Sequence, residues 1–129
     1  MIGIDIEQIS RIAKLVDRYD RTTLNLLFTH SEIEQCQFAP SHYYALCFSA
    51  KEAVGKALGT GLADIGWTEI EVTIAPHILD IQLSGAAYDL AIQQHIHRWY
   101  ATWWTWDDYV LVQVFASTIL HPQNDYVSS

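Results

Sequence analysis

The stretch FSAKEAVGKALGTG, residues 48–61, is the most informative part of the chain. It ends a longer segment, residues 42–58, that has no proline and is rich in Ala and Leu, which are strong helix formers. Small and apolar residues return near the helical period, so we expect one side of this helix to face a core. Gly59 then stands where a left-handed backbone costs glycine little. The stretch therefore predicts a buried helix that ends in a Gly-Thr-Gly turn.

Two charged residues of this helix have the spacing of a binding site. Glu52 and Lys56 are four residues apart, so their side chains share one helix face. Thr60 and Gly61 follow with a hydroxyl and unhindered backbone N–H groups. Together these groups could hold phosphate oxygens, with Lys56 as a point charge and Glu52 as a ligand for a hard metal ion. On the local pattern alone, a surface ion pair and a simple helix cap explain the same residues.

Length and composition indicate one cytoplasmic domain. The chain has 129 residues, of which half are hydrophobic, so we expect a single domain over residues 1–120 and a flexible tail over 121–129. No apolar run is long enough to span a bilayer, and the N-terminus lacks the pattern of a signal peptide. Cys36 and Cys47 do not form a disulfide framework, and we interpret them as reduced, buried thiols.

The charge pattern favours an anionic protein partner. A net charge of −8 argues against a nucleic-acid partner. The basic residues nevertheless gather before residue 57, and four of them are predicted to lie on one face of a helix over residues 8–19 or just after it: Arg11, Lys14, Arg18 and Arg21. This face is either an ordinary solvated surface or a docking site for an anionic partner.

The remaining segments predict an α+β fold, with a helical N-terminal half packed on an antiparallel sheet. The predicted strands cover residues 1–5, 67–75, 78–83, 99–106 and 109–119, with a hairpin turn at Asp107-Asp108. The further predicted helices cover residues 32–37, after a cap at Thr29 or Ser31, and 86–96, while Ser41 is expected to cap the central helix. Asp5 ends the first strand, and with Glu52 it would suit Mg²⁺ if water and phosphate completed the coordination shell. Spacing alone does not show that the two carboxylates meet.

Five segments carry more information together than any one of them alone: IGIDIEQISRI at 2–12, FTHSE at 28–32, FSAKEAVGKALGTG at 48–61, WTEIEV at 67–72 and LSGAA at 83–87. In this set and this order, the chain resembles the holo-acyl-carrier-protein synthases, which are the small class of 4′-phosphopantetheinyl transferases. The resemblance covers most of the chain.

The resemblance implies an activity and a set of site residues. Such enzymes move the 4′-phosphopantetheine arm of coenzyme A onto a serine of an acidic acyl carrier protein and release adenosine 3′,5′-bisphosphate. Asp5 and Glu52 match the ligands of Mg²⁺, and Glu52 is also a candidate to take the serine proton. Lys56 matches a lysine beside the bridging phosphates, where it would stabilise the leaving group. The residues expected to bind the coenzyme are Lys51, Lys56, Gly59, Thr60 and Gly61.

The resemblance also implies two kinds of protein contact. The four basic residues Arg11, Lys14, Arg18 and Arg21 match the helix that docks the carrier protein, which agrees with the charge pattern. Members of the family are usually homotrimers whose active sites are shared between neighbours, and the aromatic C-terminal strands could serve that contact.

Two positions depart from the family pattern. Thr105 stands where the family has a histidine, and Cys47 stands where it usually has an arginine before the Phe of FSAKEA. Both expected cations resemble contacts to the nucleotide end of coenzyme A. A charge-assisted hydrogen bond to phosphate contributes about 1.5–3 kcal/mol, so two losses would weaken coenzyme binding by about 10²-fold or more.

These departures leave alternatives open. Trp103, Trp104 or Trp106 could stack on the adenine instead, or could serve core or trimer packing. A carrier-binding scaffold that has lost turnover is the alternative to an active enzyme. The histidines lack a zinc-binding spacing, and neither cysteine has a recognisable activating partner for nucleophilic catalysis.

Overall fold

The first strand, β1 (Ile2–Gln8), begins one residue later than predicted and ends three residues beyond the predicted end at Asp5. The computed structural model describes residues 1–118. Along β1 the side chains of Asp5 and Glu7 are buried and those of the isoleucines are exposed, in strict alternation. The strand continues beyond Asp5 because this alternation persists, and because β5 (Tyr109–Ser117) pairs with it as far as Gln8.

The five strands form one antiparallel sheet in the order β1-β5-β4-β3-β2, which confirms the predicted α+β class. The other strands are β2 (Ile70–Ile74), β3 (Leu79–Leu83) and β4 (Arg98–Trp106). The chain's first strand therefore lies at one edge, beside the last described strand. Residue 119 of the predicted last strand and the predicted tail over 121–129 lie outside the described residues.

The helices are α1 (Ile9–Arg18), α2 (Arg21–Leu27), α3 (His30–Cys36), α4 (Pro40–Leu58) and α5 (Gly85–Gln93). Thr29 caps α3 in a capping box with Glu32, as its sequence predicts. The predicted Ser41 cap of the central helix is wrong, because α4 begins at Pro40, whose fixed φ suits a first helical turn.

The segment Trp67–Glu69 is a short 3₁₀-helix, η1, and not the start of the strand that we predicted. The reason is the Glu69 carboxylate, which accepts hydrogen bonds from the backbone N–H groups of Gly66 at 3.1 Å and of Ala86 at 3.2 Å. This side chain thus joins η1 to the start of α5, and it explains why the segments around 67–72 and 83–87 belong together.

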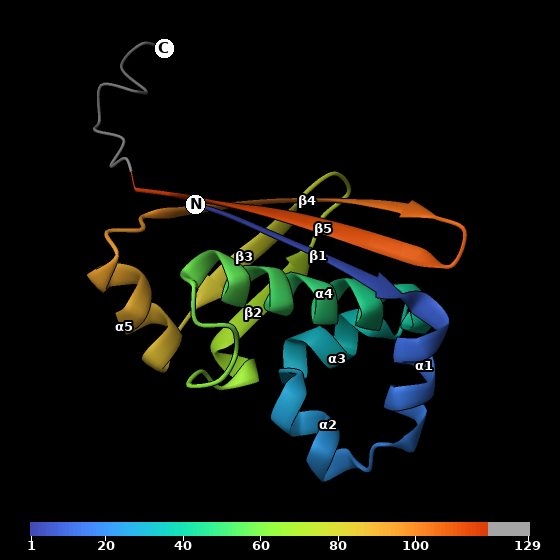
Figure 1. Cartoon of the computed structure of the whole chain (residues 1–129). Helices are drawn as coiled ribbons and strands as arrows, with labels where there is room; N and C mark the ends of the chain where they lie inside the picture. The colour runs from blue at the N-terminus through green and yellow to red at the C-terminus, as the bar shows by residue number, and fades with distance from the viewer. Residues whose placement is uncertain (119–129) are drawn as a thin grey trace.

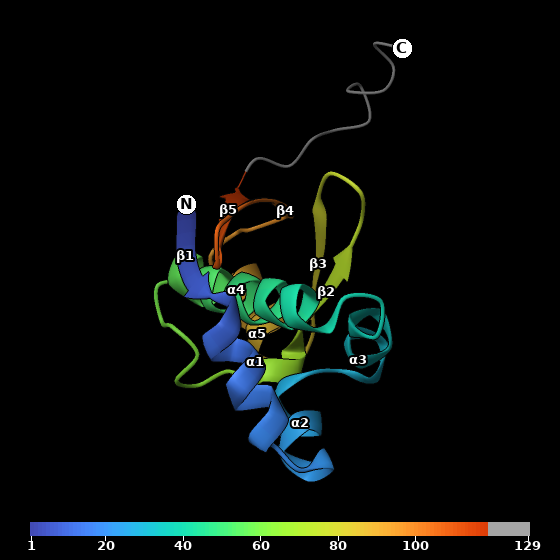
Figure 2. The same cartoon turned by 90° about the vertical axis from the view of Figure 1, so that its right-hand side faces the viewer.

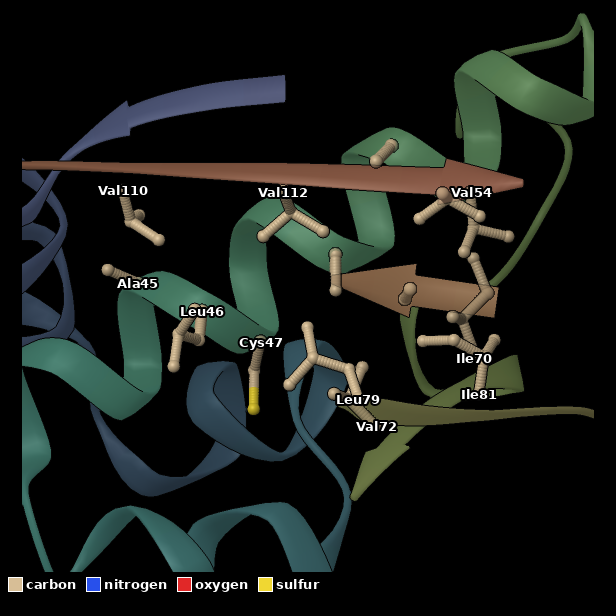
Figure 3. Packing of buried hydrophobic residues seen from close by; sticks show 14 of the residues in the cluster. Ala45, Leu46, Cys47, Val54, Ile70, Val72, Leu79, Ile81, Val110 and Val112 are labelled. Atoms are coloured by element: carbon tan, nitrogen blue, oxygen red, sulfur yellow. The ribbon is translucent and has the colours of Figure 1, made fainter. Parts of the chain in front are cut away.

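Helix α4 lies along one face of the sheet, with α1, α2 and α3 grouped at its N-terminal half and α5 towards its other end (Figures 1 and 2). Its side chains pack into the core with those of the strands, among them Leu46, Val54, Val110 and Val112 (Figure 3). Cys36 and Cys47 are free and buried, as predicted.

Gly3 sets the distance between α4 and β1. A Cβ atom at this position would lie 1.9 Å from the carbonyl oxygen of Ala53 on α4, so only glycine permits the observed contact. The close approach places the inward-facing side chains of β1 directly against one flank of α4.

The β4–β5 hairpin turns at Asp107 and Asp108, as predicted, and it also determines where α1 begins. The Asp108 carboxylate accepts a hydrogen bond from the Ser10 backbone N–H at 3.1 Å, and the Asp108 carbonyl accepts one from the Ile9 N–H at 2.7 Å. Across residues 1–118, no helix combines the length and apolar character that crossing a membrane requires.

Candidate functional site

Asp5 lies at the centre of a polar cluster between β1 and α4. Its Oδ2 accepts a hydrogen bond from the Ser49 hydroxyl at 2.9 Å, and its Oδ1 lies 3.1 Å from the Lys56 ammonium. Lys56 also donates to the Ile4 carbonyl at 3.0 Å. The Asp5 carboxylate is nearly buried, whereas about half of the Lys56 side chain is exposed. The structure thus brings a predicted metal ligand and a predicted catalytic lysine together.

Two further carboxyl groups lie close enough to Asp5 to feel its charge. Burial, and then the Asp5 charge, raise the pKa of Glu52, while Lys56 opposes the shift. Burial and the adjacent Asp5 carboxyl raise the pKa of Glu7 from 4.5 to about 7, against the lowering effect of Arg11. Glu7, near the end of β1, forms an ion pair with Arg11, four residues further along the chain in α1. The cluster therefore concentrates negative charge that its two cations offset only in part.

The Asp5 and Glu52 carboxylates suit a divalent cation that takes most of its coordination shell from water or substrate oxygens. The Lys56 ammonium already stands beside Asp5 Oδ1 as a positive charge, and its exposed side chain can move away. Among residues 1–118 no three His, Cys, Asp or Glu side chains are arranged to hold a metal ion by themselves. Asp5 and Glu52 would therefore supply two ligands at most, which is the usual pattern for Mg²⁺.

Lys51 does not fit the coenzyme-binding role that we predicted for it. Its side chain is fully buried, and its ammonium pairs with the buried Glu32 carboxylate at 2.9 Å. The same ammonium donates to the carbonyl of Trp67 at 2.8 Å and to that of Ile70. With three protein oxygens around it and no exposed surface, Lys51 joins α3, α4 and the start of β2 in the core.

The Gly-Thr-Gly turn folds back over the end of α4. Gly59 has a φ of 84°, the left-handed value predicted for it, and the Gly61 N–H donates to the Gly55 carbonyl at 3.0 Å. The Thr60 hydroxyl is exposed and donates to the Gly61 carbonyl at 2.9 Å. The turn leaves α4 one helical turn beyond Lys56, so contact of these residues with a coenzyme stays a prediction that the geometry permits.

The four predicted docking cations are exposed: Arg11, Lys14, Arg18 and Arg21. The first three recur at helical spacing on α1, and Arg21 begins α2. Arg11 lies nearest the Asp5 cluster, because its guanidinium pairs with Glu7. This cationic face therefore adjoins the carboxylates, which places any protein docked on α1 beside them.

A second site feature, the β4 cleft, lies on the other flank of α4. This cleft of about 460 Å³ is lined by nine residues: Ala39, His42, Tyr43, Leu46, Ile74, Ala75, Pro76, Trp103 and Thr105. In the sheet register, Glu7 pairs with Val110 and Val110 with Thr105, so two strand spacings, about 10 Å, separate Thr105 from the Asp5 cluster. Cys47, the other departure from the family pattern, is buried and reaches neither feature.

Two residues of the Asp5 cluster were not predicted. Ser49 shares a face with Glu52 and Lys56 through spacings of three and seven residues, and Glu7 shares a strand face with Asp5 through a spacing of two. Both periodic signals were present in the sequence. They could have been found by asking which polar residues fall on the same face as the predicted ligands.

The sequence and the fold of this chain match a known enzyme family. Residues 1–114 match the model of the 4′-phosphopantetheinyl transferase superfamily, and the chain belongs to this family. A holo-[acyl-carrier-protein] synthase of Chlamydia felis is 40% identical over 90 residues, covering 67% of this chain and 74% of the relative. The enzyme of the same name from Chloroherpeton thalassium is 43% identical over 74 residues, covering 55% of this chain and 61% of the relative.

Solved structures agree with this assignment. The Helicobacter pylori holo-[acyl-carrier-protein] synthase in complex with coenzyme A superposes with a TM-score of 0.78 at 30% identity, covering 91% of this chain and 100% of that one. The Neisseria meningitidis enzyme gives a TM-score of 0.79 at 28% identity, with coverages of 90% and 96%. The family resemblance seen in the sequence is thereby confirmed.

Proposed function

We propose that this protein transfers 4′-phosphopantetheine from coenzyme A to a serine of an acidic apo acyl carrier protein, in a reaction that needs Mg²⁺. The observation that carries this proposal is the Asp5 cluster, in which two carboxylates and a half-exposed lysine lie beside a cationic helix face. Membership of the transferase superfamily supports it. The proposal keeps the cytoplasmic location that the sequence predicts.

The transfer is a substitution at phosphorus. The serine Oγ of the carrier forms a bond to the phosphorus that bears the pantetheine arm, and the bond from that phosphorus to the bridging oxygen breaks. Adenosine 3′,5′-bisphosphate leaves with the electron pair, and the serine proton passes to a base. The raised pKa of Glu52 makes its carboxylate a stronger base than an ordinary one, and Lys56 would neutralise charge that develops on the leaving group.

A Mg²⁺ ion held by Asp5 and Glu52 would polarise the phosphate oxygens. Asp5 is prepared for this by Ser49, whose hydroxyl fixes one carboxylate oxygen while Lys56 covers the other. The exposed Lys56 is long enough to exchange its contact with Asp5 for a phosphate. Each of these residues projects from α4 or β1, so the rigid helix–strand contact at Gly3 maintains their spacing.

The carrier would dock on α1 through its acidic surface. Arg11, Lys14, Arg18 and Arg21 present four exposed cations in a chain whose net charge is −8, so the attraction is local to this face. The contact of Arg11 with Glu7 supports this, since a partner docked on α1 would then lie near the carboxylates.

The assembly that we propose is a homotrimer with active sites completed between neighbours. The sheet face turned away from α4 carries a set of exposed large apolar side chains: Ile2, Ile4, Ile6, Tyr100, Trp104, Trp106, Tyr109 and Phe115. A surface of this kind is typical of protein–protein contact. Helix α4 also separates the Asp5 cluster from the β4 cleft, so a neighbouring copy could supply one of the two features to a shared ligand.

Intact-mass spectrometry of an apo acyl carrier protein tests the function. The carrier is incubated with this protein, coenzyme A and Mg²⁺, beside an Asp5→Ala/Glu52→Ala variant and a control variant, Asp89→Ala, which removes an exposed carboxylate from α5. We expect a phosphopantetheine mass gain with the wild type and the control, and none with the double variant. No gain across several carriers, with carrier binding retained, would instead support the scaffold, and the losses at Thr105 and Cys47 would be the reason.

A further inference from the structure

The side chains of the β4 cleft are unusual for a phosphate site. Its nine lining residues include two aromatic rings, Tyr43 and Trp103, and the Thr105 hydroxyl, but no Lys, Arg, Asp or Glu. The only lining side chain that can carry a positive charge is His42. A cleft of about 460 Å³ falls in the range of small-molecule sites, and its walls suit a flat, neutral ring.

His42 is held at the mouth of this cleft by the fold. It lies in the first turn of α4, is exposed, and lines the same space as Thr105 on β4. The hairpin residue Asp108 lies close to it. Hydrogen bonding from Ser10 is the main cause that lowers the pKa of Asp108, and the charge of His42 adds to it.

We propose that His42 binds the nucleotide end of coenzyme A, and that the cleft accepts adenine nucleotides with or without a 3′-phosphate. This inference rests on the proposed function. Thr105 stands where a histidine was expected, and the buried Cys47 stands where an arginine was expected, so the chain offers neither of these two cations to the ligand. His42 supplies an imidazole from another element of the same cleft, while Tyr43 and Trp103 offer ring surfaces to the adenine.

Isothermal titration calorimetry of two nucleotides tests this inference. Adenosine 3′,5′-bisphosphate and 5′-AMP are titrated into the wild-type protein, a His42→Ala variant and a control, His30→Ala, which removes an exposed histidine of α3 outside the cleft. Because His42 is exposed, its loss leaves the fold intact, and circular dichroism verifies this. We expect His42→Ala to weaken the binding of both nucleotides about tenfold or more, and His30→Ala to leave both affinities unchanged.

A His42→Arg variant sharpens the test. A guanidinium at this position can hold a phosphate through two hydrogen bonds, so we expect the bisphosphate to bind about tenfold more tightly to this variant than to the wild type, and 5′-AMP to gain less. Unchanged nucleotide affinity in His42→Ala would overturn the role of His42. If the wild type bound adenosine 3′,5′-bisphosphate about a hundredfold more tightly than 5′-AMP, the proposal that the cleft accepts nucleotides without a 3′-phosphate would be wrong.

The inference and the proposed function fail in different ways. If the wild type binds nucleotides through His42 but transfers nothing to any carrier, the transferase proposal fails and the assignment of the cleft stands. If the wild type transfers phosphopantetheine and His42→Ala keeps the wild-type KM for coenzyme A, the assignment of His42 fails and the transferase stands.

Discussion

Replacing the buried Lys51 by methionine separates a structural role from a coenzyme-binding one. The substitution keeps the length and apolar stem of the side chain and removes only its ammonium. Glu32 then loses its ion pair and retains two backbone donors, the N–H groups of Thr29 at 2.8 Å and of Val72 at 2.7 Å. The carbonyl of Trp67 loses its lysine donor as well.

The expected loss of stability is large. Removing one partner of a fully buried ion pair costs about 3–5 kcal/mol, because the other charge stays in the core without compensation. At about 2.1 cal/mol/K of unfolding entropy per residue, a chain of 129 residues would then melt about 11–18 °C lower. The affinity of the folded variant for coenzyme A should be unchanged, since Lys51 has no exposed surface.

The penalty should also grow with pH. Burial raises the pKa of Glu32, and Lys51 opposes this, so Lys51→Met raises that pKa further. A carboxyl whose folded pKa is raised stabilises the fold below its unfolded pKa, and this contribution is lost as pH rises through the folded pKa. The difference in unfolding free energy between the wild type and Lys51→Met should therefore be smaller near pH 5 than near pH 8.

Urea denaturation followed by circular dichroism at both pH values measures these differences, and calorimetry measures the coenzyme affinity. The control is Lys51→Met/Glu32→Gln, which removes the buried negative charge and keeps one amide oxygen that can accept from one of the two backbone donors, Thr29 or Val72. This double variant should regain part of the stability and lose the pH dependence. A Lys51→Met protein of wild-type stability that binds coenzyme A more than tenfold less tightly would refute this reasoning and restore the predicted binding role.

Two further substitutions probe the contact between β1 and α4. Gly3→Ala places a methyl group 1.9 Å from the Ala53 carbonyl oxygen, so we expect a destabilisation of about 2–3 kcal/mol or more. Transfer should also be lost, because Asp5 moves away from α4. Urea denaturation measures the stability and the mass assay measures the transfer, and a variant of wild-type stability would contradict the close approach. Glu7→Gln removes a carboxyl whose pKa is raised from 4.5 to about 7, so in EDTA the wild type alone should lose up to about 3 kcal/mol of stability as pH rises from about 4.5 through 7. Parallel stability curves of the two proteins over this range would disprove the burial of that carboxyl.

Much of the fold could be read from local patterns. The cap at Thr29, the left-handed Gly59 and the hairpin at Asp107-Asp108 are determined by residues close to them in sequence. Gly59 and the hairpin are confirmed as predicted, and Thr29 is the cap out of the two predicted candidates, Thr29 and Ser31. The start of α4 was misjudged although its cause, Pro40, is local, whereas the 3₁₀-helix η1 was misjudged because a distant partner decides it. Glu69 holds η1 through bonds that reach the start of α5, and no short window contains both ends of that contact.

The two lysines of α4 illustrate the same limit within the site. Lys51 and Lys56 occur in one motif, and their chemistry is identical. Their burial follows from neighbours at helical spacing: Lys51 shares a face with Cys47, Val54 and Leu58, and this apolar stripe carries it into the core. That signal was available, but the buried partner Glu32 belongs to α3, and only the assembled fold shows that it meets Lys51.

The pairing of β1 with β5 has a consequence for how the protein is made. Asp5 is opposite Val112 in the sheet, so a ribosome has to add more than a hundred residues before the strand that carries Asp5 has a partner strand. A nascent chain that stops short of β5 already contains Ser49 and Lys56, but only the contact of β1 with α4 then holds Asp5 beside them. Such a distant pairing is slow to form, so the active site should be among the last parts of the molecule to appear during synthesis.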